Sequence, residues 1–576
     1  MMRWLGLGLL ILVLMTGSAT AAEADVVVVG GGAAGMAAAI EAAETGAEVI
    51  LLEKLPMLGG ALRYTAGTIS GAGTKIQEAQ GIEDSPELHF LDSMVEADFL
   101  AIPDLLMLYC ELAGPTIDWL VEDLDVNIVE AVFAPEHTLY SVPRSYKPER
   151  VDGMGAVLYG LLEGIERYPN ITVHMETKAI RLLQDPLTDR IMGVGAVDGQ
   201  GRYVEFHGVQ GTILATGGFG SNQRLLERYQ PESSNWVMIT ASGATGDGHR
   251  MGAEVGAGLT HMEFVPTYNY GFIRANGQPA LVYVRSELFG GIYVNQDGER
   301  FVNEMTTQKE REHALRQQPD NIMFEVFDES IRLANNRPHI NAFCESGEIA
   351  SAATIRGLAA EVGLDPDVFE ATINRYNAFV EHGEDLDYGK EQLMAKIAEP
   401  PFYAAKLRPL GLLTLGGLTV DTTMRVLNQD GDIIPGLYAA GELLGGVHGT
   451  HISSGNGITA PLAFGRLAGQ QVVLAEPFSL GQTEAVQEDV ELVDGVFRAE
   501  VESYGGRLTV EVEIVNAEIV RIDVLSHQDT SAIADPAFAT LIDRMLEANS
   551  PHVDAVSGAT VSSDALVEAV LQAVTE

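Results

Sequence analysis

The sequence predicts an α/β protein with several domains, and three observations lead to this class. The chain has 576 residues, of which 46% are apolar and 62 are glycine, a composition that suits buried cores joined by many tight loops. Near the N-terminus a continuous apolar run, residues 26–29, precedes a glycine cluster and an alanine-rich stretch. A second apolar run follows at residues 49–52, so strand, helix and strand alternate as they do around a parallel sheet.

The first 21 residues have the features of an export signal. Arg3 is a single positive residue, an apolar run covers residues 4–15, and the small residues that end at Ala21 suit cleavage before Ala22. The alternative is an uncleaved N-terminal anchor, although the apolar run is short for a membrane span of about 20 residues. The sequence therefore predicts an exported protein, periplasmic or extracellular, and leaves membrane association open.

Charge and cysteine content exclude two classes of protein. The formal net charge is -46 at pH 7, whereas nucleic-acid binding needs a positive face for the phosphate backbone. The two cysteines, Cys110 and Cys344, lie in no CxxC or CxxCH pattern, so the chain offers no attachment for c-type haem and no iron–sulfur ligand set. We predict no metal site, and any electron transfer requires an organic cofactor.

The first apolar run leads into "GGGAAG", in which Gly30, Gly32 and Gly35 form a GxGxxG pattern before a helix expected at residues 37–44. The three glycines serve a tight turn, a close approach of the backbone to a pyrophosphate, and close packing of helix on strand. The phosphate oxygens would lie at a helix N-terminus, and Glu53, after the second strand, would accept hydrogen bonds from a ribose. NAD and FAD both remain possible from this segment alone.

The continuation of the chain adds glycine-rich loops that follow strands or begin helices. They are "MLGGAL", "ATGGFG", "TGDGHR", "AAGELL" and a last loop before a helix near Gly457. Each of them alone could be an ordinary glycine turn. Together they favour FAD and add these cofactor-binding candidates: Gly59, Gly60, Gly217, Asp247, Glu442, Gly457 and Ile458.

Over residues 25–469 these motifs resemble the flavoprotein family of soluble fumarate reductase, urocanate reductase and 3-ketosteroid 1-dehydrogenase. The resemblance implies an FAD domain of the two-dinucleotide-binding type at residues 22–265 and 413–475. It also implies an α+β capping domain, here called the cap, inserted at residues 266–412. The first glycines and Glu53 would hold the adenosine and pyrophosphate side, and the later candidates would lie along the ribitol and isoalloxazine.

Near the C-terminus, "DAVSGATVSS" places Thr560 in a stretch of small residues. A local explanation is that the hydroxyl and carboxylate side chains of residues 562–564 cap a last helix. The motif is also similar to that of exported FMN-binding domains, in which a flavin transferase esterifies the FMN phosphate to the threonine. Alternating strands and a helix before it fit a small α+β FMN-binding domain at residues 490–576, after a linker at 476–489.

The chain differs from dicarboxylate reductases where that resemblance places the substrate. The family's "HHTMGG" reads "LLTLGG", with Leu412 and Leu413 in place of two histidines. Ile452 and Gln308 stand where the family has two arginines, a substrate ligand and a proton donor. Burying a doubly charged substrate without such partners is costly, so the sequence argues against fumarate and favours an uncharged or singly charged substrate.

Apolar and aromatic side chains gather in "MEFVPTYNYGF" at the expected edge of the cap: Met262, Phe264, Tyr268, Tyr270 and Phe272. They are either core residues or the wall of a site for a ring-containing substrate. Candidates for the catalytic proton donor are His451, which lies near the flavin by motif position, and then Tyr270, Arg311, Arg285 and His448.

The leading hypothesis is an exported FAD-dependent oxidoreductase of the fumarate/urocanate reductase type, active in anaerobic respiration. A membrane or extracellular donor would reduce covalent FMN, FMN would reduce non-covalent FAD, and a hydride would pass to an activated C=C bond of a small organic acceptor. One alternative keeps the fold and reverses the direction, as a ketosteroid-type dehydrogenase. Another is an extracellular electron-transfer flavoprotein without a substrate of its own.

Overall fold

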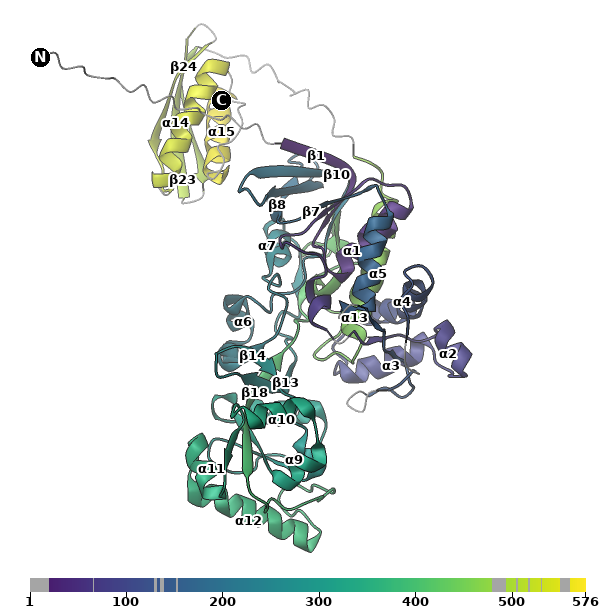
Figure 1. Cartoon of the computed structure of the whole chain (residues 1–576). Helices are drawn as coiled ribbons and strands as arrows, with labels where there is room; N and C mark the ends of the chain where they lie inside the picture. The colour runs from purple at the N-terminus through teal and green to yellow at the C-terminus, as the bar shows by residue number, and fades with distance from the viewer. Residues whose placement is uncertain are drawn as a thin grey trace, which may run out of the picture. The chain divides into compact units, whose positions relative to one another are not determined.

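The computed structural model of the protein describes residues 20–65, 67–128, 132–134, 139–151, 154–478, 494–503, 506–515, 518–529, 531–549 and 560–575 (Figure 1). The chain divides into two compact units, Met1–Phe478 and Ser479–Glu576. Within the described ranges, no helix is both long and apolar enough to cross a membrane. The predicted export signal, residues 1–21, lies outside the described residues except for its last two positions.

The first unit is built on a sheet with the strand order β20-β21-β10-β1-β2-β7, extended by the antiparallel strands β9 and β8. The pairs from β21 to β7 are parallel, and residues 26–29 of β1 are at most 5% exposed because both faces of the sheet are covered. The strands are β1 (Thr20–Val29), β2 (Val49–Leu52), β7 (Ile171–His174), β8 (Lys178–Gln184), β9 (Ile191–Val197), β10 (Tyr203–Leu214), β20 (Arg425–Leu427) and β21 (Ile433–Ala439).

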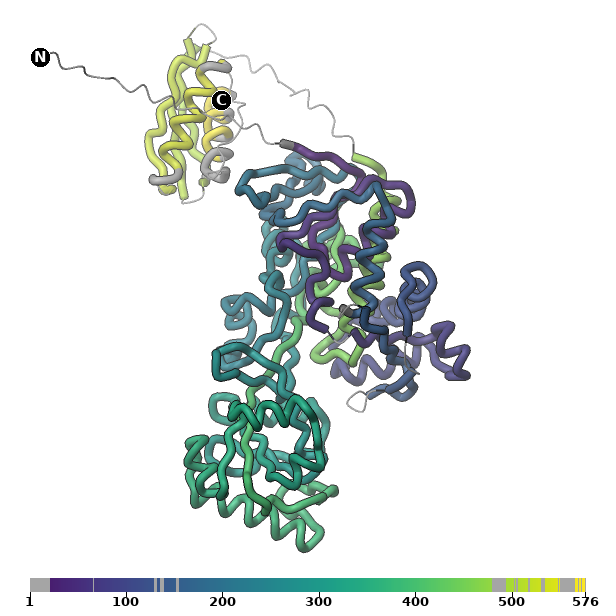
Figure 2. Tube along the Cα trace, viewed as in Figure 1, coloured from purple at the N-terminus to yellow at the C-terminus, as the bar shows by residue number. Residues whose placement is uncertain are grey.

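Two helices from opposite ends of this unit pack against each other, as the purple and light green tubes show in Figure 2. They are α1 (Ala33–Glu44) and α13 (Asn456–Val472). A Cβ at Gly465 would lie 2.3 Å from the carbonyl oxygen of Ala34, and a Cβ at Gly469 would lie 2.4 Å from that of Ala38. These two glycines therefore allow the closest approach of the helix backbones.

A helical layer lies beside α13. The fully buried Arg144, which lies outside the helices, links its own segment to this layer. Its guanidinium pairs with Asp84 at 2.9 Å and with Asp92 at 2.8 Å. Further elements of the first unit are η1 (Gly60–Tyr64), β3 (Ile69–Ser70), α2 (Lys75–Gln80), α3 (Pro86–Glu96), α4 (Pro103–Glu122), β4 (Ser145–Tyr146), β5 (Arg150–Val151), β6 (Met154–Gly155), α5 (Ala156–Arg167), α6 (Gln223–Tyr229), η2 (Pro231–Asn235), α7 (Asp247–Glu254), β12 (Leu259–Thr260), β19 (Gly417–Leu418) and η5 (Gly441–Leu443).

A second sheet has the order β14-β13-β18-β16-β15, and β11 and β17 also pair with β18. Its own apolar core includes Phe324, Phe369 and Tyr376. The strands are β11 (Val237–Met238), β13 (Thr267–Ile273), β14 (Pro279–Leu281), β15 (Ile292–Val294), β16 (Met323–Asp328), β17 (Ala350–Ala352) and β18 (Phe402–Gly411). The helices are η3 (Ser286–Phe289), α8 (Gln308–Arg316), η4 (Pro319–Asn321), α9 (Glu329–Asn335), α10 (Pro338–Glu345), α11 (Ile355–Val362) and α12 (Pro366–His382).

The second unit is a small α+β domain. Its antiparallel sheet has the order β22 (Gly495–Ser503), β23 (Gly506–Val515) and β24 (Glu518–Ser526). Alternate β23 residues, Leu508, Val510, Val512 and Ile514, are at most 1% exposed and share a core with α14 (Ser531–Ala548) and α15 (Thr560–Thr575). Thr560 is the first residue of α15, and its side chain and the preceding small-residue loop lie outside the described residues.

Candidate functional site

A cavity of about 620 Å³ opens where the parallel strands β1, β2 and β10 end and the helices α1 and α13 begin. This is the edge at which doubly wound sheets bind dinucleotides. Nine of the residues predicted to bind the cofactor line the cavity: Gly30, Gly32, Glu53, Gly60, Gly217, Asp247, Glu442, Gly457 and Ile458.

The glycine cluster has a different geometry at each position. Gly30 has φ +110°, and a Cβ there would lie 2.3 Å from the carbonyl oxygen of Ala215. A Cβ at Gly35 would lie 1.8 Å from the Gly30 carbonyl oxygen, whereas a Cβ at Gly32 would have no atom within 4 Å. Gly32 is the N-cap of α1. The backbone thus leaves room for a pyrophosphate beside the unpaired N–H groups of the first helical turn.

Glu53 follows β2 and is 7% exposed. Its Oε2 accepts the Gly31 N–H at 2.9 Å and its Oε1 accepts the Leu55 N–H at 2.7 Å. Each carboxylate oxygen keeps acceptor capacity for a further donor. The residue therefore fits the role of ribose acceptor at the adenosine end of the cavity.

Asp247 begins α7 and joins two lysines on the cavity wall. The Lys54 ammonium lies 2.5 Å from Asp247 Oδ2, and the Lys178 ammonium lies 3.3 Å from Oδ1. Burial opposes ionisation of Asp247, but the hydrogen bond and charge of Lys54 hold its pKa below the usual value. The sequence alone does not predict these ion pairs, because the partners are far apart along the chain.

Glu442 lies in the cavity wall after β21. Its Oε1 accepts the Thr414 N–H at 2.9 Å and the Thr414 hydroxyl at 3.2 Å. Burial raises the pKa of Glu442 to about 7, so near neutral pH the carboxyl group can act as donor or acceptor. A Cβ at Gly218 would lie 2.2 Å from Glu442 Oε1, so only glycine fits opposite this carboxyl.

The N-terminus of α13 forms another part of the wall. Gly455 has φ +92°, and Gly457 and Ile458 in the first turn line the cavity. The aligned peptide dipoles place a partial positive charge at this helix end. Such an end suits the electronegative pyrimidine edge of a flavin.

The end of the cavity near the second sheet is apolar. No arginine or histidine is among the described residues that line the cavity, and its two lysines are paired with Asp247. The apolar and aromatic lining residues at this end are Ile239, Tyr268, Leu281, Leu412, Leu413 and Ile452.

Behind this apolar end lies a buried hydrogen-bonded group that contains two of the proton-donor candidates. The Tyr270 hydroxyl donates to Gln308 Oε1 at 2.7 Å, and Arg311 Nη2 donates to the same oxygen at 2.9 Å. Gln308 Nε2 donates to Asn269 Oδ1 at 2.7 Å. Burial raises the pKa of Tyr270. Tyr270 also packs in a small cluster with Tyr268, which lines the cavity.

Arg285 belongs to an adjacent buried group. Its Nε donates to Glu287 Oε1 at 2.8 Å and its Nη1 donates to the Tyr283 hydroxyl at 3.0 Å. Glu325 accepts the backbone N–H and the hydroxyl of Ser286, at 2.6 and 2.7 Å. Burial and the neighbouring Glu287 raise the pKa of Glu325 to about 8. Arg285 therefore has a carboxylate partner, and Glu325 holds a proton at neutral pH.

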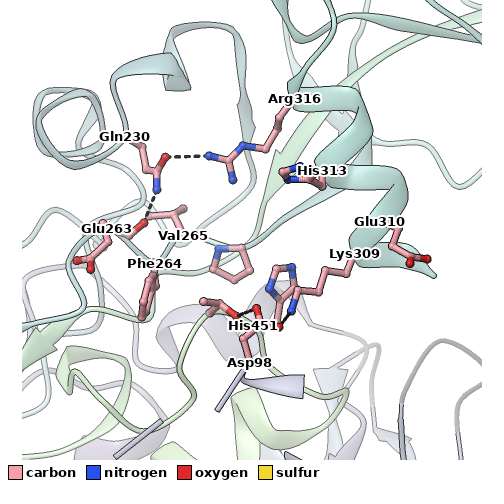
Figure 3. A pocket seen from close by; sticks show the side chains of 12 residues that line it. Asp98, Gln230, Glu263, Phe264, Val265, Lys309, Glu310, His313, Arg316 and His451 are labelled. Carbon is pink, nitrogen blue, oxygen red and sulfur yellow. Dashed lines mark hydrogen bonds and ion pairs between the residues drawn. The ribbon is translucent and has the colours of Figure 1, made fainter. Parts of the chain in front are cut away.

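A second cavity, of about 430 Å³, lies between the start of α8 and the segments around residues 98, 264 and 450 (Figure 3). Lys309 forms an ion pair with Asp98, which also accepts the Thr450 hydroxyl at 2.6 Å. His451 lines this cavity, and its ring nitrogens have no partner in the described part of the chain. Burial, reinforced by the Lys309 charge, lowers the pKa of His451 to about 4, so the ring is neutral.

The remaining predicted residues lie elsewhere. His448 is in edge contact with Tyr109, at 5.7 Å between ring centroids, and burial lowers its pKa to about 3. Gly59 precedes η1 and donates its N–H to Gly31. Met262 and Phe272 are core residues, whereas Phe264 lines the second cavity.

The fold and the first cavity are those of a dinucleotide-binding protein, a class that binds its cofactor across the carboxyl ends of a parallel sheet. The family model described as "FAD binding domain" matches residues 25–458, and the chain belongs to this family. The model described as "FMN-binding domain" matches residues 503–575. The protein is therefore a flavin-dependent oxidoreductase with domains for both FAD and FMN, which confirms the predicted fold class and cofactors.

Two relatives illustrate the family. The chain is 34% identical to fumarate reductase (cytochrome) from Shewanella frigidimarina, over 78% of this chain and 76% of the relative. It is also 34% identical to urocanate reductase from Eggerthella lenta, over 78% and 74% of the two chains.

Two solved structures share the fold of the first unit. One is the open conformation of a flavocytochrome c3 fumarate reductase, with a TM-score of 0.70, 28% identity, and coverage of 79% of this chain and 78% of the other. The other is a 3-ketosteroid-Δ4-(5α)-dehydrogenase from Rhodococcus jostii with 4-androstene-3,17-dione, with a TM-score of 0.64, 28% identity, and coverage of 78% and 97%.

Proposed function

We propose that the protein reduces an activated C=C bond in a small acceptor that is uncharged or singly charged and has an apolar or ring-containing part. The observation that supports this substrate class most directly is the apolar end of the FAD cavity, formed by Leu412, Leu413, Ile452 and Tyr268. FAD, when bound, would supply the hydride for this reduction. The residues of the chain then have to hold the cofactor, exclude water and provide a proton.

The glycine cradle around Gly32, Glu53 at the adenosine end and the N-terminus of α13 at the flavin end would hold FAD. Glu442, whose pKa is near 7, provides a donor or acceptor along the cavity wall. Gly217 and Asp247 also line the cavity and complete the set of predicted cofactor contacts. Asp247 is held in place by its ion pairs with lysine.

We propose Tyr270 as the proton donor. It packs in one cluster with Tyr268 and Leu412, which line the FAD cavity, and Arg311 lies 3.4 Å from its hydroxyl. The guanidinium stabilises the phenolate that forms when the proton leaves. Tyr270 does not itself line the FAD cavity, but it packs directly against side chains that do. The other candidates are less suited, because His451 lines the second cavity, Arg285 is paired with Glu287 and His448 packs on Tyr109.

Fumarate fits this cavity poorly. Two carboxylates in a buried site need charge-assisted hydrogen bonds, and the cavity lining described above offers no unpaired cation. The relative from Shewanella is named for fumarate, so the two chains are expected to differ in substrate. A ketosteroid-type dehydrogenase is the second candidate, favoured by the same apolar end and by the steroid-bound structural neighbour.

A reoxidation assay tests the proposal. Photoreduced holoprotein is mixed anaerobically with a panel of enones, cinnamate-like enoates and fumarate, and flavin absorbance is followed. We expect reoxidation by enones or monocarboxylic enoates at rates at least tenfold above that with fumarate. Reoxidation by fumarate alone would overturn the substrate assignment. Reduction of oxidised protein by saturated ring ketones, without any reoxidation by the panel, would favour the dehydrogenase.

We propose further that the protein is exported by residues 1–21 and that a flavin transferase attaches FMN at Thr560. A membrane or extracellular donor would supply electrons to that FMN. The predicted division into an FAD domain, the cap at residues 266–412, a linker and an FMN-binding domain also remains part of the proposal. The two compact units and the separate core of the second sheet support it.

A further inference from the structure

A buried polar cluster lies directly behind the loop that leads into α13. Residues 453–455 of this loop line the FAD cavity, and Asn456, the first residue of α13, is 1% exposed. The cluster draws on α3, α4 and the segment around residue 140, which are distant from α13 in sequence. None of the cofactor contacts described above involves it.

Two tyrosine hydroxyls converge on one side-chain oxygen in this cluster. Tyr109 of α4 and Tyr140 each donate to Asn456 Oδ1 at 2.8 Å. Tyr109 is fully buried and Tyr140 is 9% exposed. An amide oxygen has two lone pairs, so the two phenols saturate it. The arrangement fixes the first residue of α13 from two directions.

The hydrogen-bond network extends to the loop backbone, where the single proton of the Tyr140 hydroxyl is shared between two acceptors. The Tyr140 hydroxyl lies 3.0 Å from the Ser454 carbonyl oxygen, and the Ser70 hydroxyl donates to that oxygen at 2.7 Å. Ser70 also blocks any side chain at Gly455, where a Cβ would lie 2.2 Å from the serine hydroxyl. The cavity-lining loop is thus supported by hydrogen bonds on its rear side, away from the cofactor.

The histidine in this cluster, His89, is uncharged. His89 is fully buried and lies in edge contact with both tyrosine rings, at 5.5 and 5.9 Å between centroids. Burial, together with the Arg144 charge, lowers the pKa of His89 to about 3, and Arg144 is itself paired with two aspartates. His89 therefore adds no charge to this side of the wall, and the N-terminus of α13 brings a partial positive charge to the cavity.

We propose that Tyr109 and Tyr140 are positioning residues that hold the N-terminus of α13 against the flavin and thereby set the midpoint potential of FAD. The partial positive charge of a helix N-terminus stabilises the additional negative charge of the reduced cofactor more than the oxidised form. Loss of the phenols leaves Asn456 Oδ1 buried without donors, and the loop has to shift to regain hydrogen bonds. The helix end then moves from its place, and the potential falls.

The test compares Tyr109→Phe, Tyr140→Phe and the double variant, all in the full chain with Thr560→Ala so that FAD is the chromophore titrated. The midpoint potential is measured by equilibration with reference dyes during slow anaerobic reduction. We expect the double variant to favour oxidised FAD by about tenfold, which is about 30 mV for a two-electron couple. Each single variant should shift in the same direction by less.

Tyr376→Phe is the matched control, since this tyrosine is fully buried in the core of the second sheet and its hydroxyl has no partner among the described residues. The control should leave the FAD potential unchanged. Circular dichroism and the Tm of each variant verify folding, and if the double variant does not fold, the two single variants carry the test. A potential equal to that of the control in folded Tyr109→Phe and Tyr140→Phe would overturn the proposal.

Discussion

Gly32→Ala separates cofactor binding from folding more clearly than any other change in the glycine cluster. The backbone at Gly32 has φ -83° and ψ -168°, a conformation open to alanine, and its Cβ would meet no protein atom within 4 Å. The added methyl group would instead occupy the space beside the first turn of α1, where the pyrophosphate approaches the backbone. The apoprotein should therefore fold normally and bind FAD weakly.

The magnitude follows from two opposing terms. In the apoprotein, a Gly→Ala change at a compatible conformation stabilises by about 0.4–1 kcal/mol through the unfolded chain, while alanine is a poorer N-cap than glycine by a similar amount. The net change in unfolding free energy is therefore near zero. In the complex, an extra methyl group in a packed contact costs about 1–3 kcal/mol, which is roughly a 5- to 150-fold rise in the Kd for FAD.

The assay is fluorescence titration of the apoprotein with FAD, combined with its thermal unfolding. Gly155→Ala is the matched control, because this glycine also has open space around its Cβ position but does not line the cavity. Gly35→Ala is the opposite case, since its Cβ would lie 1.8 Å from a carbonyl oxygen and should lower the Tm of the apoprotein. Normal FAD affinity in folded Gly32→Ala would refute the placement of the pyrophosphate.

Three further changes test other parts of the site. Thr560→Ala, produced beside a flavin transferase, should lose the FMN mass from the C-terminal peptide and keep the FAD absorbance; an adduct that persists would contradict the attachment site. Glu325 has a pKa of about 8 in the folded chain against 4.5 when free, so the stability it contributes is complete below pH 4.5 and is lost as pH rises through 8. Glu325→Gln should accordingly flatten the decline of Tm between pH 5.5 and 8.5, and parallel Tm curves for the two proteins would exclude the assignment. Ile452→Arg adds a cation to the apolar end of the cavity and should strengthen fumarate binding at least tenfold in ligand titrations; unchanged affinity would show that residue 452 does not face the substrate.

The cofactor half of the site could be proposed from the sequence because that half is local. The strand, the glycines, the first turn of α1 and Glu53 lie within about thirty consecutive residues, and their spacing is typical of dinucleotide binding. Gly30, Gly32 and Glu53 line one cavity of the structure. The alternating pattern of β23 predicted the core of the second unit in the same way.

The rest depends on contacts between distant segments, which no local pattern encodes. Lys54 meets Asp247 across 193 positions, and Tyr109 meets Asn456 across 347. His451 shows the limit of motif position, because its neighbour Ile452 lines the FAD cavity whereas His451 itself lines the second cavity. Side-chain direction at adjacent positions is a property of the folded loop.

The packing of Gly465 and Gly469 of α13 on Ala34 and Ala38 of α1 has a consequence for how this enzyme can change over evolutionary time. The two helices line the cofactor cavity and form one frame, because backbone contacts join the first half of α1 to the second half of α13. Substitutions at Leu412 or Leu413 lie outside that frame. New acceptors can therefore be acquired by exchanging a few side chains at one end, while the redox machinery is inherited intact.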